Sequence, residues 1–164
     1  MTKKLVLFVM VLGLLLLWST VQADPIFFGT AKVILDKGSE NGFGLGGNFD
    51  VGLPLGDRVI LRGTYDAYKT YDGTGYDNGF TGFTVLSGTL IEKIKAGLYL
   101  TGEGGISKVT GADVDFATLS SMGFYSEVGE FTNLWLGGGY SSVAEGGQIW
   151  SFTFAISIEA PLGK

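Results

Sequence analysis

The feature that most constrains the fold is a two-residue alternation between large apolar residues and small or polar ones. Between residues 43 and 53, for example, the odd positions include Phe43 and Phe49, whereas the even positions carry only Gly, Asn and Asp. Successive side chains of a β-strand point to opposite faces, so this period predicts strands with two unlike faces. No stretch after Asp24 keeps the apolar spacing of an amphipathic helix. The sequence therefore predicts an all-β fold.

Eight segments have this strand character, although both faces of the fourth and sixth are mixed. They are residues 26–35, 43–53, 58–68, 79–90, 94–104, 116–127, 132–142 and 147–160. Most are about 10–13 residues long, whereas soluble strands are most often about 5–6 residues and a tilted bilayer-crossing strand needs about 9–11. The apolar faces of the six clearly patterned strands carry no charge, and glycines thin the polar faces. This combination predicts an eight-stranded antiparallel up-and-down transmembrane β-barrel, with large residues facing lipid and a narrow polar lumen.

Four basic and four acidic residues on the polar faces are expected to form a polar network in the lumen. They are Lys32, Asp50, Arg58, Arg62, Asp66, Lys95, Glu103 and Glu159. Equal numbers of opposite charges favour mutual pairing over a carboxyl group tuned for catalysis. If the turn is residues 55–57, Asp50 lies directly opposite Arg62 on the polar face. We therefore predict an Asp50–Arg62 ion pair, extended by Lys32, Asp66 and Glu103; simple hydration of a water-filled bore is the alternative.

The first 23 residues have the three-part layout of a secretory signal peptide. A basic start with Lys3 and Lys4 precedes an apolar run over residues 5–18, and small residues end at Ala23. The apolar run is shorter than the roughly 20 residues of a spanning helix. We expect cleavage between Ala23 and Asp24, which divides the chain into a signal peptide, residues 1–23, and a barrel domain, residues 24–164.

The connections between the expected strands alternate in length. Residues 36–41, 69–78, 106–115 and 142–146 form the longer, Gly-rich set, and residues 54–57, 91–93 and 128–131 the shorter set. With the N-terminus in the periplasm, the longer set lies outside the cell. Aromatic residues gather toward the strand ends, which favours two interfacial girdles. The girdle candidates are Phe27, Tyr125 and Trp135 at the turn end, and Phe43, Tyr65, Tyr68, Tyr140 and Trp150 at the loop end.

Composition excludes several chemistries. The chain has neither Cys nor His, so it contains no disulfide, thiolate nucleophile, Cys/His zinc site or imidazole base. Its net charge of −5 argues against a nucleic-acid partner. We expect no catalytic residue, no metal site and no cofactor.

The signal peptide, the eight amphipathic strands, the short turns and the aromatic girdles together resemble the small outer-membrane β-barrel family of OmpA/OmpX type. The resemblance implies an exported barrel in a Gram-negative outer membrane, monomeric, in contact with membrane lipids including lipopolysaccharide, and inserted by the barrel-assembly machinery. Enzymes among such small barrels rely on a catalytic His, which is absent here. Family members usually finish on an aromatic residue, whereas this chain continues from Ile158 to Lys164 without one.

Three functions follow as hypotheses. The first is a non-enzymatic outer-membrane barrel with a structural, surface-interaction or weak-permeation role in the cell envelope. The second is a narrow pore or carrier for ions or small hydrophobic molecules. The third is a soluble, lipocalin-like barrel that binds an apolar ligand.

Overall fold

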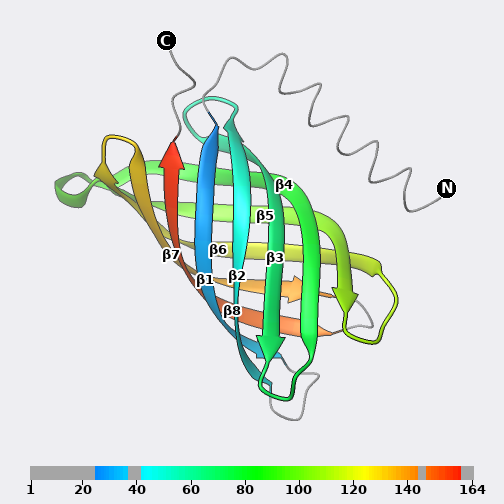
Figure 1. Cartoon of the computed structure of the whole chain (residues 1–164). Coiled ribbons are helices and arrows are strands. Elements are labelled where there is room, and N and C mark those ends of the chain that lie inside the picture. Colours follow the sequence, from blue (N-terminus) through cyan, green and yellow to red (C-terminus); the bar gives the residue numbers. More distant parts are fainter. Residues whose placement is uncertain (1–24, 37–41, 144–146, 160–164) are drawn as a thin grey trace.

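The computed structural model describes residues 25–36, 42–143 and 147–159, which form a closed antiparallel barrel of eight strands (Figure 1). The strands are β1 Ile26–Asp36, β2 Phe43–Pro54, β3 Val59–Thr70, β4 Gly75–Ile91, β5 Ala96–Val109, β6 Asp115–Gly129, β7 Thr132–Ser142 and β8 Gln148–Glu159. A short 3-10 helix, η1 Glu92–Ile94, joins β4 to β5. No helix in this described part is long and apolar enough to span a membrane. The predicted signal peptide and its cleavage site, Ala23–Asp24, lie outside the described residues.

Each strand pairs with the next, and β1 closes the ring on β8. Following the paired residues from Ile26 around the ring returns to β1 at Asp36, ten residues farther along the strand. Such a stagger requires strands tilted by about 35–45° from the barrel axis. The tilt is visible in Figure 1, where the β4–β5 and β6–β7 hairpins project beyond the neighbouring strands at the turn end.

The central strands are longer than expected, and two connections are correspondingly shorter. We expected loops at 69–78 and 106–115, but β4 begins at Gly75 and β5 continues to Val109. These polar residues still pair across strands, for example Tyr76 with Val109 and Asp77 with Lys108. Extending the ladder satisfies backbone hydrogen bonds that a loop would leave to water, so polarity alone was a poor guide to the strand ends.

The two faces of the strands are distributed as the alternation predicts. Outward residues such as Phe49, Met122 and Phe152 are 55–65% exposed, whereas inward residues such as Asp50 and Arg62 are buried. The mixed strands follow the same rule, because Phe83 and Val85 of β4 point outward. Apolar residues thus cover the outside of the barrel and polar residues enter its interior.

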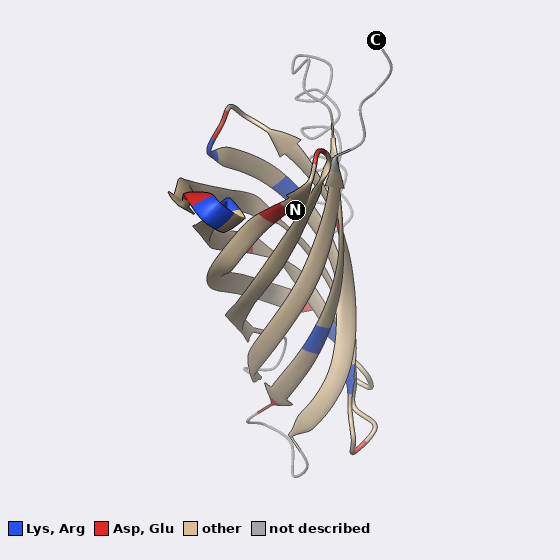
Figure 2. Cartoon of the chain, turned by 90° about the vertical axis from the view of Figure 1, so that its left-hand side faces the viewer, with Lys and Arg blue, Asp and Glu red and all other residues tan. Residues whose placement is uncertain are grey.

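A charge-free belt surrounds the barrel. Among the described strand positions that alternate outward, the charged residues are Lys69, Asp77 and Lys108, all close to the loop end. At the opposite end, charged residues such as Lys95 and Glu127 gather at the hairpin turns, and Figure 2 shows charged residues in the short helix and in the turns. The uncharged stretch between the two ends matches the height of a bilayer core, which about 9–11 tilted residues cross.

Some of the expected girdle residues lie inside the barrel instead. Phe27 stacks on Phe49, and Tyr140 contacts Trp150, on the outer face. Tyr68, Tyr125 and Trp135, by contrast, are buried in interior clusters. Their positions alternate inward, so nearness to a strand end did not determine which face an aromatic residue occupies.

Candidate functional site: the polar interior

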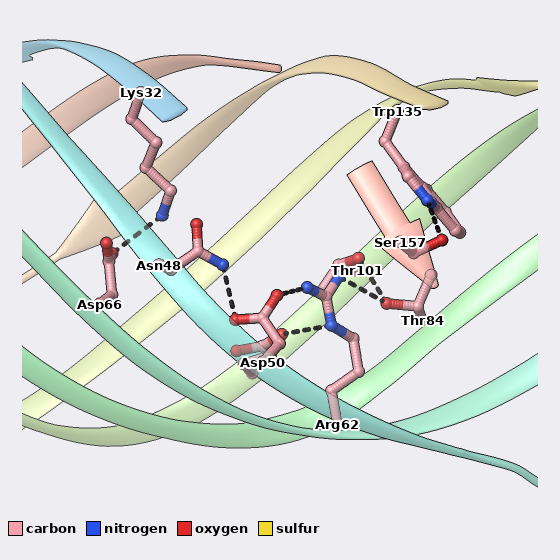
Figure 3. Close-up of polar contacts among 10 residues, drawn as sticks. Lys32, Asn48, Asp50, Arg62, Asp66, Thr84, Thr101, Trp135 and Ser157 are labelled. Carbon is pink, nitrogen blue, oxygen red and sulfur yellow. Dashed lines mark hydrogen bonds and ion pairs between the residues drawn. The ribbon is translucent and has the colours of Figure 1, made fainter. Parts of the chain in front are cut away.

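Charged side chains from β1, β2, β3 and β5 meet inside the barrel. Arg62 of β3 forms an ion pair with Asp50 of β2, and its Nε lies 3.7 Å from a carboxylate oxygen of Glu103 on β5. Nearer the loop end, the Nζ of Lys32 on β1 donates a hydrogen bond to the carboxylate of Asp66 on β3 at 2.9 Å. Figure 3 shows the two groups side by side across the lumen. All five side chains are at most 10% exposed, so each charge is stabilised by its partner rather than by water.

The predicted Asp50–Arg62 ion pair is present, but the register behind the prediction was wrong by two residues. Asp50 lies opposite Thr64, and Arg62 lies opposite Gly52. The connection between β2 and β3 has four residues, closed by a hydrogen bond from the Leu55 amide to the Val59 carbonyl. A shift of two residues leaves every side chain on its own face, so the pair forms along the diagonal instead of directly across.

Hydroxyl groups and a ring complete the surroundings of Arg62. Its Nη1 donates to Thr84 Oγ1 at 3.3 Å, and Thr84 is hydrogen-bonded to Thr101 at 2.7 Å. The guanidinium carbon lies 4.3 Å from the centre of the Phe28 ring, a cation–π arrangement. Arg62 is therefore held by carboxylates, a hydroxyl and an aromatic face at once. A planar donor with five N–H groups suits such a site better than a lysine does.

Glycines make room for these side chains in a narrow barrel. A Cβ at Gly82 would lie 2.6 Å from the Cα of Glu103, its cross-strand partner, and one at Gly46 would lie 2.2 Å from the Cβ of Tyr68. Both distances are shorter than any real contact, so a larger residue cannot occupy either position without moving the neighbouring strand. Eight strands enclose an interior only wide enough for side chains. A glycine opposite a large residue leaves the space that the large side chain needs, so the barrel can remain narrow.

Apolar clusters lie on both sides of the charged network, one toward the turn end of the barrel and one toward the loop end. At the turn end Phe28, Tyr99, Tyr125 and Trp135 pack together, and Trp135 donates its indole N–H to Ser157 at 2.8 Å. At the loop end a second cluster contains Ile34, Tyr68, Tyr76, Val143 and Ile149. The Tyr68 and Tyr76 rings stack at 4.6 Å, and Tyr76 donates to Asp36.

A small cavity lies between the charged network and the turn-end cluster. Its volume is about 40 Å³, and its lining includes Asn48, Thr64, Thr101 and Glu103. A polar space of this size holds a few water molecules at most. Nothing in its dimensions admits a larger solute.

Two residues expected in the lumen network, Arg58 and Lys95, do not join it in the structure, and the position of a third, Glu159, leaves its expectation untested. Arg58 precedes β3 and is exposed at the turn end. Lys95 follows η1 with a left-handed backbone (φ 45°), and its exposed side chain pairs with Glu127 at 3.4 Å. Both lie in hairpin turns rather than strands, so the alternation used to place them does not apply. Glu159 is the last residue of β8, and its side chain lies outside the described part.

Four further features of the interior were not predicted from the sequence: Thr84, Thr101, Phe28 and the Trp135–Ser157 pair. Thr84 belongs to the fourth strand, whose mixed faces gave no clear inward side. The alternation of β5 does place Thr101 beside Glu103 on the polar face, and that signal was available. Within the described residues, no group of three or more Asp or Glu side chains is arranged to hold a metal ion.

Comparisons with known proteins support the fold alone. No protein-family model matches the chain, and no curated protein sequence matches it. The crystal structure of Neisserial surface protein A (NspA) superposes with a TM-score of 0.70 at 12% identity, covering 83% of this chain and 97% of that one. A de novo designed transmembrane β-barrel (TM-score 0.52, 10% identity) covers 84% of this chain and 99% of the design.

Ail, the attachment invasion locus protein of Yersinia pestis, also matches, with a TM-score of 0.52 and 11% identity over 85% of this chain and all of that one. The chain thus has the architecture of small eight-stranded outer-membrane barrels. The identities are too low to carry any property of these proteins to it beyond the fold.

Proposed function

We propose that the protein is a non-enzymatic, integral outer-membrane β-barrel of OmpA/OmpX type, with a structural and surface-interaction role in the cell envelope. The observation that carries the proposal is the inverted distribution of side chains. Large apolar residues cover the outside in a charge-free belt, while buried ion pairs occupy the inside. A closed barrel pairs every strand edge, which a bilayer requires because it offers no water to unpaired backbone groups. A lipocalin-like soluble barrel needs the opposite distribution.

The closed interior favours a structural role over a pore. Three apolar clusters and the ion-paired network fill much of the lumen, and the cavity beside the network has a volume of only about 40 Å³. Opening such a path would require separating Arg62 from Asp50 and Glu103, which leaves buried charges without partners. A narrow pore or carrier is therefore the weaker hypothesis.

The loop end is the surface we propose for contacts outside the cell. The β3–β4 turn is ordered by side chains, since Thr70 donates to Asp72, and the Thr74 amide donates to the same carboxylate at 2.9 Å. Tyr71, at the tip, is 72% exposed. A rigid turn that presents an aromatic residue suits recognition, because little conformational entropy is lost on binding. Lipopolysaccharide is the expected lipid neighbour at this end, and the barrel-assembly machinery the expected route of insertion for a monomer.

Gel mobility before and after boiling tests the membrane proposal. A folded barrel resists detergent and migrates differently from the heated chain, and the protein should stay with the membrane fraction until detergent extraction. Release by a mild salt wash would contradict membrane insertion. Planar-bilayer recordings then separate the two membrane hypotheses: silence at high protein load is expected for the closed barrel, and a steady conductance would favour the pore.

A further inference from the structure

An open apolar groove crosses the outer wall of the barrel over β4 to β8, away from the polar interior. Its volume is about 760 Å³. Large apolar side chains form most of its walls, among them Leu98, Leu100, Met122, Phe124, Leu136 and Phe152. Its lining residues carry no charge, and the polar side chains among them are those of Ser87 and of Tyr99, whose ring packs in the interior turn-end cluster.

A glycine contributes to the hollow at this point of the wall. Along a row of outward residues, Leu100 pairs with Met122, Met122 with Gly138, and Gly138 with Phe152. Gly138 therefore leaves a gap between two large side chains that face lipid. A Cβ at this position would meet only the Ser151 carbonyl oxygen, at 3.5 Å, so the backbone permits a side chain and the sequence omits it.

The depth of the groove identifies what can occupy it. On β5, its residues Leu98 and Leu100 lie inside the charge-free belt, nearer Lys95 at the turn end than Lys108 at the loop end. In an inserted barrel the β5 side of the groove is surrounded by lipid tails of the leaflet on the turn side, and the groove reaches toward the middle of the bilayer at Gly138 and Phe152, which lie nearer the loop ends of β7 and β8. A hollow left empty there forfeits the dispersion contacts of its walls, so hydrocarbon will fill it.

We propose that the groove binds an acyl chain of a phospholipid from the leaflet on the turn side, in preference to the rest of the belt. The inference rests on the proposed membrane insertion. A second copy of the chain is the less suitable occupant. In a two-fold dimer about this face, the groove of one copy would face the groove of the other, and neither copy would fill the space. A flexible acyl chain follows the groove without needing a matching ridge.

Photolabelling in vesicles tests the site. The full-length mature barrel is reconstituted in phosphatidylcholine vesicles that contain a phosphatidylethanolamine with a diazirine in one acyl chain, and labelled peptides are quantified by mass spectrometry. We expect peptides carrying Met122 and Leu136 to be labelled about threefold or more above outward positions of β2 at similar depth. Gly138→Leu, which fills the gap, should remove this excess.

Gly29→Leu is the matched control. Gly29 also points outward between two large residues, Phe49 and Ile156, and a Cβ there meets nothing within 4 Å, but it does not line the groove. This variant should keep the labelling excess, and both variants should keep the heat-dependent gel mobility of the folded barrel.

The outcomes separate the two proposals. Even labelling around the belt, or an excess that survives Gly138→Leu, overturns the groove and leaves the membrane barrel standing. Disulfide-linked dimers of a Gly138→Cys variant at low protein density would identify a second copy as the occupant and also overturn the acyl-chain proposal. Absence of labelling on every strand, together with unchanged mobility on heating, overturns membrane insertion itself.

Discussion

Two ion pairs in this barrel have the same chemistry and opposite surroundings. Arg62 pairs with Asp50 and approaches Glu103 where all three side chains are at most 10% exposed. Lys95 pairs with Glu127 at the turn end, where the side chains are 66% and 46% exposed. At the surface, water solvates each charge when the ion pair is broken. In the interior, a charge that loses its partner has no water to replace the lost interaction. Burial, rather than the mere presence of an ion pair, therefore determines how much the stability of the fold depends on that pair.

The largest effect is expected for Arg62→Met. The substitution keeps much of the side-chain volume but leaves Asp50 and Glu103 buried without a cation. We expect a loss of about 4–5 kcal/mol in the free energy of unfolding. Urea unfolding of the reconstituted barrel, followed by tryptophan fluorescence and gel mobility, measures it.

The triple variant Asp50→Asn, Arg62→Met, Glu103→Gln is the control for that substitution. It removes the orphaned charges together with the guanidinium, so it should recover most of the lost stability. A loss below about 1 kcal/mol for Arg62→Met alone would mean that water reaches the network, and the contrast with Lys95 would disappear.

Lys32→Met should have the next largest effect. Lys32 forms an ion pair with Asp66 at 2.9 Å. Its substitution leaves one buried carboxylate without a cation, whereas Arg62→Met leaves two. We expect a loss of about 3 kcal/mol in the same unfolding measurement. Adding Asp66→Asn should restore much of it, and an effect equal to that of Arg62→Met would show that the two ion pairs act as a single unit.

Trp135→Phe addresses the neutral part of the interior. It removes the donor to Ser157, a residue with no exposed surface, and keeps an aromatic ring in the turn-end cluster. Leaving a buried hydroxyl without its partner costs about 1–2 kcal/mol, less than stranding a charge. Trp135→Phe combined with Ser157→Ala should be more stable than Trp135→Phe alone. Equal stability of the two would show that water replaces the indole as the partner.

The sequence was sufficient to predict the barrel and its faces, because alternation over long strands depends only on the pleat of the backbone. It also placed Asp50, Arg62, Lys32, Asp66 and Glu103 on one side, since an error of two residues in register does not change the face. It was not sufficient for Arg58 and Lys95, because the side-chain direction in a turn depends on local backbone angles such as the left-handed φ of Lys95. Nor could it reveal the groove beside Gly138, which depends on cross-strand neighbours more than ten residues away in sequence.

The smallest effect is expected for Glu127→Gln, at the exposed end of the comparison. The change removes the charge that faces Lys95 and keeps the shape of the side chain, and both groups remain hydrated without each other. The free energy of unfolding should change by less than about 0.5 kcal/mol, and salt should reduce even that difference. Asp50→Asn, the same carboxylate-to-amide change inside the barrel, is the matched buried variant and should be several times more destabilising. If the two substitutions cost the same, burial does not separate the pairs, and the interior behaves electrostatically like the surface.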